Sequence, residues 1–403
     1  MTEVLEPELV LVRAPEPRTV LPALDGSPPP GAGVRTLRGV SRDAVANLVG
    51  GAVSALSIGL LVFGRLTPLA GNLGFVTFTY VVFLVAYALL VSQSEDRPAV
   101  VDRVMGVVLT TMAVIAGLAL VSVVLYTLWR GRVALAKVNL YTQDMSAAGP
   151  LDPLDVGGIG HAIVGSLIMI AISLVLTVPL GLMCAVFLNE RRGRAATLVR
   201  TIVDAMTALP SILAGLFVFA TWVLVLGFER SGLTASIAIS VMMLPIVIRS
   251  ADVVLRLVPG NLREAALALG APQWRTVWYV VLPTARSGLA TSVILGVARG
   301  VGETAPVLLT AGFSSTLNLN PLEGPMVSLP LATFEFVRSP QQELIARGFA
   351  TAAVLMLVVL VLFAAARVIG GRPPGSTTRR QARRVAARSA RDLARFDARR
   401  VPA

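Results

Sequence analysis

The sequence predicts an all-α membrane protein that crosses the bilayer several times, and two observations lead to this fold class. Of the 403 residues, 55% are apolar and 14% are charged, and the mean hydropathy is +0.78. A composition of this kind is typical of polytopic membrane proteins. The apolar residues also gather into eight runs, each about as long as the 20 or so residues that a helix needs to span a bilayer. We therefore expect about eight transmembrane helices.

The eight runs fall into an N-terminal pair and a core of six. They occur at 44–63, 74–91, 105–128, 162–188, 202–228, 234–256, 287–312 and 348–369. The first two lie within 44–92, carry no residues that suggest chemistry, and are interpreted as an appended two-helix extension. The other six define a core over 93–370. The sixth run is interrupted by Pro245 and by polar residues.

Both ends of the chain differ from the spans in composition. Residues 1–43 open with Glu3, Glu6 and Glu8 and continue through three consecutive prolines, unlike the basic start and apolar centre of a cleavable secretory signal. We expect a disordered cytoplasmic arm, with a regulatory segment as the alternative. Residues 371–403 hold ten arginines and two aspartates, a formal charge of +8. They are expected to form a basic cytoplasmic tail that meets either anionic membrane lipid or solvent.

The distribution of arginine predicts the orientation of the spans. Lys137 is the only lysine, so arginine carries nearly all of the positive charge. Besides the tail, the loops after the fourth and sixth runs are rich in it: Arg191, Arg192, Arg194, Arg200, Arg263, Arg275 and Arg286. Because positively charged loops remain in the cytoplasm, we assign these segments and both termini to that side. Segments 131–160 and 313–346 then face outward.

The most specific motif lies within the loop 261–283. It begins with Glu264, Ala265 and Ala266, reaches Gly270 after three further residues, and ends in a Leu-Pro pair. The residues before the glycine favour a short helix, and glycine permits the sharp exit from it. This spacing resembles the cytoplasmic loop of ATP-binding-cassette importer permeases, which docks on a separate ATPase. The resemblance implies that these four residues couple the chain to ATP hydrolysis by a partner.

Three charged residues stand out within the predicted spans, where each costs about 2.5–3.5 kcal/mol on translocon scales. Arg299 and Glu303 are four residues apart in the seventh run and share a helical face, and Pro306 is expected to kink that helix. Arg249 lies in the cytoplasmic half of the sixth run. One interpretation makes Arg299 and Glu303 a buried pair that fixes helix packing. The other makes the arginines the lining of an anion path, since a guanidinium binds a tetrahedral oxyanion through two parallel hydrogen bonds.

The segment 157–370 resembles the PstA family, the permease subunits of phosphate-specific ABC importers. The resemblance rests on the loop motif and on segments 208–215, 243–259 and 297–312, the last with Gly-Glu-Thr-Ala-Pro after an intramembrane arginine. It implies a six-helix type I importer permease core in the plasma (inner) membrane. It also implies three partners: a homologous PstC-like permease, a dimeric PstB-like ABC ATPase and an extracytoplasmic PstS-like phosphate-binding protein.

The resemblance further implies the function and its residues. The chain is expected to be a permease subunit for inorganic phosphate, with ATP and magnesium bound by the partner ATPase and no cofactor held by this chain. Arg249 and Arg299 occupy the motif positions of arginines that are proposed to meet phosphate in the family, and Glu303 is the family glutamate. A permease for sulfate or molybdate, and a membrane subunit that signals the state of a transporter, stay open as alternatives.

Other function classes find little support in the sequence. No G-x-x-x-x-G-K-[ST] loop is present to hold nucleotide phosphates. Cys184 is the only cysteine and His161 is the only histidine, which excludes a disulfide framework and a histidine-rich metal site. The 6% of aromatic residues lie mainly in apolar runs, which argues against nucleic-acid binding. An intramembrane hydrolase would have to use Ser211 and His161, which are predicted at opposite ends of their spans; His161 is expected to be an ordinary interfacial residue.

Overall fold

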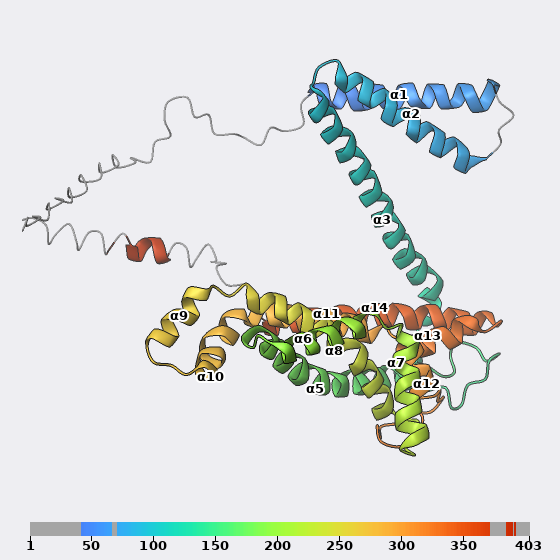
Figure 1. The fold of residues 1–403 in the computed structure, drawn as a ribbon. Helices are drawn as coiled ribbons and strands as arrows, with labels where there is room; N and C mark the ends of the chain where they lie inside the picture. Colours follow the sequence, from blue (N-terminus) through green and yellow to red (C-terminus); the bar gives the residue numbers. More distant parts are fainter. Residues whose placement is uncertain (1–41, 67–70, 371–383, 390, 392–403) are drawn as a thin grey trace, which may run out of the picture. The chain divides into compact units, whose positions relative to one another are not determined.

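The regular structure is entirely helical over the residues that the computed structural model describes, namely 42–66, 71–370, 384–389 and 391. The helices, including three short π-helical segments (η), are α1 (Arg42–Leu61), η1 (Val62–Leu66), α2 (Asn72–Ser92), α3 (Arg97–Leu135), α4 (Asn139–Thr142), α5 (Gly160–Glu190), α6 (Arg194–Ala208), α7 (Ser211–Val218), η2 (Phe219–Val225), α8 (Gly232–Arg256), α9 (Gly260–Ala268), α10 (Gln273–Thr276), η3 (Val277–Val281), α11 (Leu282–Val301), α12 (Ala305–Thr310), α13 (Leu329–Arg338) and α14 (Gln342–Gly370). Figure 1 shows their course.

The number of membrane crossings agrees with the prediction. Among the described residues, seven helices are long and apolar enough to span a bilayer, and a strongly bent pair, α6 with α7–η2, makes up to eight. The chain is therefore a multi-pass all-α membrane protein. Most of the predicted arm 1–43 and of the tail 371–403 lies outside the described ranges, so their predicted states are untested.

Contacts divide the chain into two units after Gly117, a point within α3. In the first unit α1 and α2 pack as an antiparallel hairpin (Figure 1). A Cβ added to Gly51 would lie 3.4 Å from the backbone of Tyr87, and one added to Gly59 would lie 2.4 Å from Thr79 Oγ1. Small residues thus allow the two helices to approach closely, as is common in membranes. The domain boundaries predicted from the sequence, at 43, 92 and 370, remain predictions.

In the second unit α8 is the central helix, with α5 and α11 packed against it. Glycines again set the spacing. A Cβ at Gly181 of α5 would lie 2.9 Å from Val247 Cγ1, and Cβ atoms at Gly296 and Gly300 of α11 would lie 2.5 Å from Val247 Cγ2 and Met243 Sδ. α8 also runs without a break through Pro245, so the interruption expected in the sixth run is absent.

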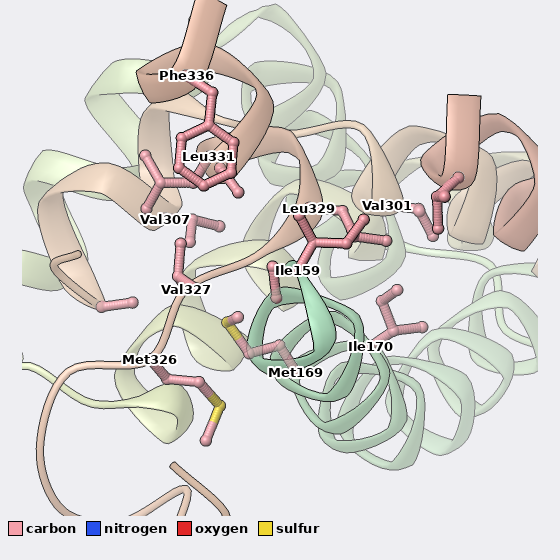
Figure 2. Close-up of a cluster of buried hydrophobic side chains, with 14 of the residues drawn as sticks. Ile159, Met169, Ile170, Val301, Val307, Met326, Val327, Leu329, Leu331 and Phe336 are labelled. Carbon is pink, nitrogen blue, oxygen red and sulfur yellow. The ribbon is translucent and has the colours of Figure 1, made fainter. Parts of the chain in front are cut away.

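The largest apolar cluster lies beside the start of α5 (Figure 2). Met169 and Ile170 of α5 pack there with Leu329, the first residue of α13, and with Val301 at the end of α11. The backbone N–H of Leu329 donates a hydrogen bond of 2.7 Å to Ser166 Oγ on α5. The cluster therefore fixes the end of α11 and the start of α13 against α5.

The predicted fifth span, 202–228, is not a single straight helix. α6 ends at Ala208, α7 begins at Ser211, and the two helices meet at 108°. Pro210 explains the break, because proline has no N–H to donate and disfavours the helical conformation in the residue before it. Leu209 accordingly has φ −69° and ψ 130°.

The seventh span is also broken instead of kinked at Pro306. α11 ends at Val301 and α12 begins at Ala305. A proline ring clashes with the carbonyl four residues earlier in a helix, which here is that of Gly302, so the helix ends at this glycine. Pro306 then stands in the first turn of α12, where a missing N–H costs nothing.

The loop after α4 and the loop after α12 meet at one end of the second unit. Met145 N–H donates to the carbonyl of Ser315 (2.9 Å), and Leu317 N–H donates to Asp144 Oδ2 (3.1 Å). Hydrogen bonds from the Ser146 hydroxyl and backbone N–H, and from Leu317, lower the pKa of Asp144 below its usual value. The two segments that were assigned to the outside therefore share one face.

The loop that carries the Glu-Ala-Ala motif lies at the opposite end of α8. Ser231 lies just before the start of α8, and its N–H donates to the carbonyl of Thr310, the last residue of α12. The start of α8 therefore lies near the loop that follows α12. Arg263 of α9 instead donates to the carbonyl of Leu255, near the last residue of α8. In the bent pair, Arg200 and Asp204 of α6 contact Asp252 and Arg249 in the last third of α8, whereas η2 ends at Val225, shortly before the start of α8 at Gly232. This course supports counting the pair as one crossing.

The side of the membrane that each end faces can be measured by cysteine labelling. With Cys184 replaced by alanine, cysteine at the exposed position Ser315 should react with a membrane-impermeant maleimide in intact cells. Cysteine at the exposed position Ala195, in the arginine-rich turn, should react only after permeabilisation. The reverse pattern would overturn the orientation, and labelling of both in intact cells would mean a miscounted span.

Candidate functional site

Arg299 and Glu303 lie together, as their spacing predicted. Arg299 Nη2 is 2.9 Å from Glu303 Oε1, while the side chain of Arg299 is 49% exposed and that of Glu303 is 8% exposed. Glu303 Oε1 makes no hydrogen bond of good geometry, so the contact is an ion pair without aligned donors. A guanidinium has five N–H donors. Arg299 therefore keeps donors on its exposed side for an arriving anion.

The end of α11 holds this pair in place. Glu303 N–H donates to the carbonyl of Gly300 (3.3 Å), which closes a turn just after the helix. Gly300 is buried against Met243 of α8. Because that face of α11 is fixed against α8, Arg299, the neighbouring residue, projects from a different and exposed face.

A close contact between α7 and α12 fixes the chain just after the turn that carries Glu303. A Cβ at Gly215 would lie only 2.5 Å from Pro306 Cα. Gly215 belongs to the motif segment 208–215 and Pro306 to the segment 297–312. Two of the motifs found in the sequence therefore meet directly, and together they position the turn that carries Glu303.

Arg249 does not join this pair. Its Nε donates to Asp204 Oδ1 on α6 (3.0 Å), and the side chains of Arg249 and Asp204 are 53% and 49% exposed. The contact of Gly300 with Met243 places Arg249 about five residues, roughly 8 Å, from Arg299 along the helix axes. The two predicted path arginines are thus at neighbouring levels but have different carboxylate partners.

The predicted loop helix is present as α9, and Gly270 ends it. Gly270 has φ +82°, a left-handed conformation that side chains with a Cβ rarely adopt. Its N–H donates to the carbonyl of Leu267, and the N–H of Ala271 donates to that of Ala266. These two bonds form a Schellman motif. A Cβ would meet nothing within 4 Å, so the requirement for glycine is one of conformation and not of space.

α9 is tied to the bundle by one residue and is otherwise open. Arg263 donates to Asn189 Oδ1 (2.6 Å) and lies 3.3 Å from Glu190 Oε1, both at the end of α5. No residue of α9 is buried, and Leu269 and Trp274 just after it are 89% and 61% exposed. The motif residues Glu264, Ala265 and Ala266 lie on this open helix, which is the surface expected of a docking element.

Three charged residues escaped the sequence analysis. Asp204 and Asp252 fall within predicted spans, so the cost of an intramembrane charge was the signal that could have found them. Asp252 pairs with Arg256 at 2.6 Å. Arg347 is 1% exposed and donates to the carbonyl of Pro153. The predicted eighth span began one residue after it, whereas α14 starts at Gln342 and places Arg347 inside the helix.

His161 is buried within the protein, and its expected place at the membrane interface stays a prediction. It is the second residue of α5, is 3% exposed, and neither ring nitrogen has a hydrogen-bond partner among the described residues. Ser211 begins α7 and makes no hydrogen bond to the ring of His161. In the described part of the chain, no group of three or more His, Cys, Asp or Glu side chains could hold a metal ion.

Comparison with known proteins shows that this chain is similar to transport permeases. The family described as "Binding-protein-dependent transport system inner membrane component" matches residues 177–372. Phosphate transport system permease protein PstA 1 of Mycobacterium tuberculosis (strain CDC 1551 / Oshkosh) is 39% identical over 246 residues, which cover 61% of this chain and 80% of that protein. The PstA protein of Pasteurella multocida (strain Pm70) is 34% identical over 249 residues, covering 61% and 86%.

A solved structure is also similar. A chain of the MetNI methionine ABC transporter, in an inward-facing conformation, matches 53% of this chain and 93% of its own length, with 18% identity and a TM-score of 0.41.

Proposed function

Since the chain belongs to the PstA family of phosphate transport system permease proteins, we propose that it is a transmembrane permease subunit of an ATP-driven importer of inorganic phosphate. It forms the translocation path with a second, PstC-like permease. A PstB-like ATPase binds ATP and magnesium, and a PstS-like protein delivers phosphate from outside. Both termini are cytoplasmic, and this chain itself catalyses no reaction.

The observation that carries the proposal is the exposed guanidinium of Arg299 above the buried carboxylate of Glu303. A buried charge is retained only where a partner compensates it, and Arg299 compensates the buried carboxylate of Glu303. The free N–H donors of Arg299 can bind an oxyanion bidentately. Arg249, about a turn and a half away along the axes, supplies a second positive charge. Neither arginine depends on the identity of the anion, so both attract oxyanions in general.

Selectivity for phosphate is assigned to Glu303. Phosphate near neutral pH keeps at least one proton and can donate a hydrogen bond to a carboxylate, whereas sulfate has no proton to give. A site with a buried acceptor discriminates strongly against a ligand that leaves it unpaired. Glu303 Oε1 is buried and lacks an aligned hydrogen-bond donor, which suits this role.

Replacing Glu303 with glutamine should reduce the preference for phosphate over sulfate by about tenfold, because the amide keeps the shape but adds a donor. The measurement is uptake of each anion by proteoliposomes, using a complex that transports without its binding protein so that discrimination by that protein is removed. An unchanged preference in a well-folded Glu303→Gln complex would leave only the packing role for this residue.

The overall proposal is tested by reconstituting the complex and supplying phosphate, sulfate and molybdate in turn. ATP-driven accumulation of phosphate, with the other two weakly transported, is the expected result. Equal or greater uptake of sulfate or molybdate would make the chain a permease for another oxyanion. ATP hydrolysis with no accumulation of any of the three would favour a signalling subunit.

A further inference from the structure

A hollow of about 550 Å³ is lined by residues of α5, α6, α8 and α9 and of the turn between α5 and α6, and neither Arg299 nor Glu303 lines it. We call it the arginine pocket, since five arginines line it: Arg191, Arg192, Arg200, Arg256 and Arg263. They come from the turn between α5 and α6, from α6 itself, from the end of α8 and from α9. Elements far apart in the sequence thus bring their positive charges to one cavity.

Carboxylates balance only part of this charge. Asp252 lies 2.6 Å from Arg256 and 3.8 Å from Arg200, and Glu190 lies 3.3 Å from Arg263. Neither Arg191 nor Arg192 forms an ion pair with any described residue, so two of the five guanidinium groups keep all of their N–H donors. The charges of Arg191 and Arg192 stay uncompensated beside the three paired arginines, and an anion in the pocket would be attracted to them.

The backbone and the side chains both favour a phosphoryl group as the anion. α6 begins at the pocket, and no side chain caps its first N–H groups, which leaves the positive end of the helix dipole open to an anion. Arginine binds phosphate oxygens through paired hydrogen bonds. Basic pockets between membrane helices on the cytoplasmic side also accept the phosphate of lipid headgroups.

We propose that the arginine pocket binds a phosphoryl group, either free phosphate in the cytoplasm or the headgroup of an anionic lipid. The pocket is separate from the translocation site, and this inference does not depend on the proposed function. It has a consequence for α9, because Arg263 belongs both to the pocket and to that helix. An anion in the pocket competes with Glu190 and Asn189 for Arg263 and so alters the attachment of α9 to α5.

The test measures binding of radiolabelled inorganic phosphate to the full-length chain in its complex, held in phosphatidylcholine nanodiscs. Arg191→Gln with Arg192→Gln should weaken binding at the pocket at least tenfold. Both side chains are exposed, so the double variant should fold. The matched control is Arg194→Gln with Arg286→Gln, which removes two exposed arginines that do not line the pocket, and it should change the affinity less than threefold.

A second arm identifies the source of the phosphoryl group. If a lipid headgroup is the occupant, nanodiscs of phosphatidylglycerol should suppress phosphate binding to the pocket, and this lipid should co-purify with the wild-type chain but not with the double variant. Arg299→Gln should leave the affinity of the arginine pocket for phosphate unchanged. Loss of the translocation site can therefore be distinguished from loss of the pocket. The proposal is overturned if neither ligand responds to the loss of Arg191 and Arg192, or if both double variants lose binding equally.

Discussion

Replacement of Arg299 by glutamine should reduce ATP-driven phosphate uptake about a hundredfold or more, while the protein still inserts and assembles. The side chain is 49% exposed, so its loss leaves little buried void. Each hydrogen bond between a charged donor and an anion contributes about 1.5–3 kcal/mol, and two such bonds account for a change of this size. Uptake of radiolabelled phosphate by proteoliposomes measures the effect, with the amount of assembled complex as the control.

A double variant separates transport from packing. If Arg299 and Glu303 only neutralise one another, Arg299→Gln with Glu303→Gln should recover most of the uptake, because no uncompensated charge then remains. If Arg299 binds the anion, the double variant should stay inactive. The same comparison applies to Arg249, since Asp204→Asn should rescue Arg249→Gln only if Arg249 acts through its ion pair with Asp204.

Replacement of Gly270 by valine should uncouple ATP hydrolysis from phosphate uptake and lower uptake at least tenfold. At φ +82° a β-branched side chain is strained, and both hydrogen bonds of the Schellman motif would be disturbed. α9 buries none of its own residues, so little else would keep its end in place. The ratio of phosphate transported to ATP hydrolysed is the quantity to measure.

Two further variants serve as controls for Gly270. Asparagine tolerates the left-handed conformation, so Gly270→Asn should retain much of the coupling. Gly260→Ala, at the start of α9, has an ordinary φ and open space around its Cβ, and it should couple normally. Normal transport by Gly270→Val would contradict the assignment of α9 as the helix that docks on the ATPase.

Hydropathy predicted the membrane crossings well because it depends on composition along a single helix. The runs at 74–91 and 234–256 differ from α2 and α8 by at most two residues at each end. The helix breaks at Pro210 and Pro306 were not predicted, because composition does not report how a proline is packed. Pro210 and Pro306 both end helices, whereas Pro245 lies within α8, and the sequence alone does not distinguish a proline that breaks a helix from one that packing tolerates.

The local parts of the site were predictable, and the long-range parts were not. The four-residue spacing alone brought Glu303 to Arg299, and the motif predicted a sharp helix exit at Gly270. The partner of Arg249 could not be foreseen, because Asp204 is 45 residues away in the sequence and meets it only through the packing of α6 against α8. The arginine pocket likewise depends on α9 folding back to place Arg263 beside the end of α5.

Phosphate protection of a cysteine beside Arg299 tests most directly whether the substrate passes this residue. Leu295 is 53% exposed and one helical turn before Arg299 on the same face. In a Cys184→Ala background, a small methanethiosulfonate reagent should block uptake by Leu295→Cys, and phosphate, but not sulfate, should slow the reaction. Val361 of α14 is also exposed. The reaction of a cysteine there should neither block uptake nor be slowed by phosphate. Reaction at Leu295→Cys that is unaffected by phosphate and leaves uptake intact would contradict a translocation path along Arg299.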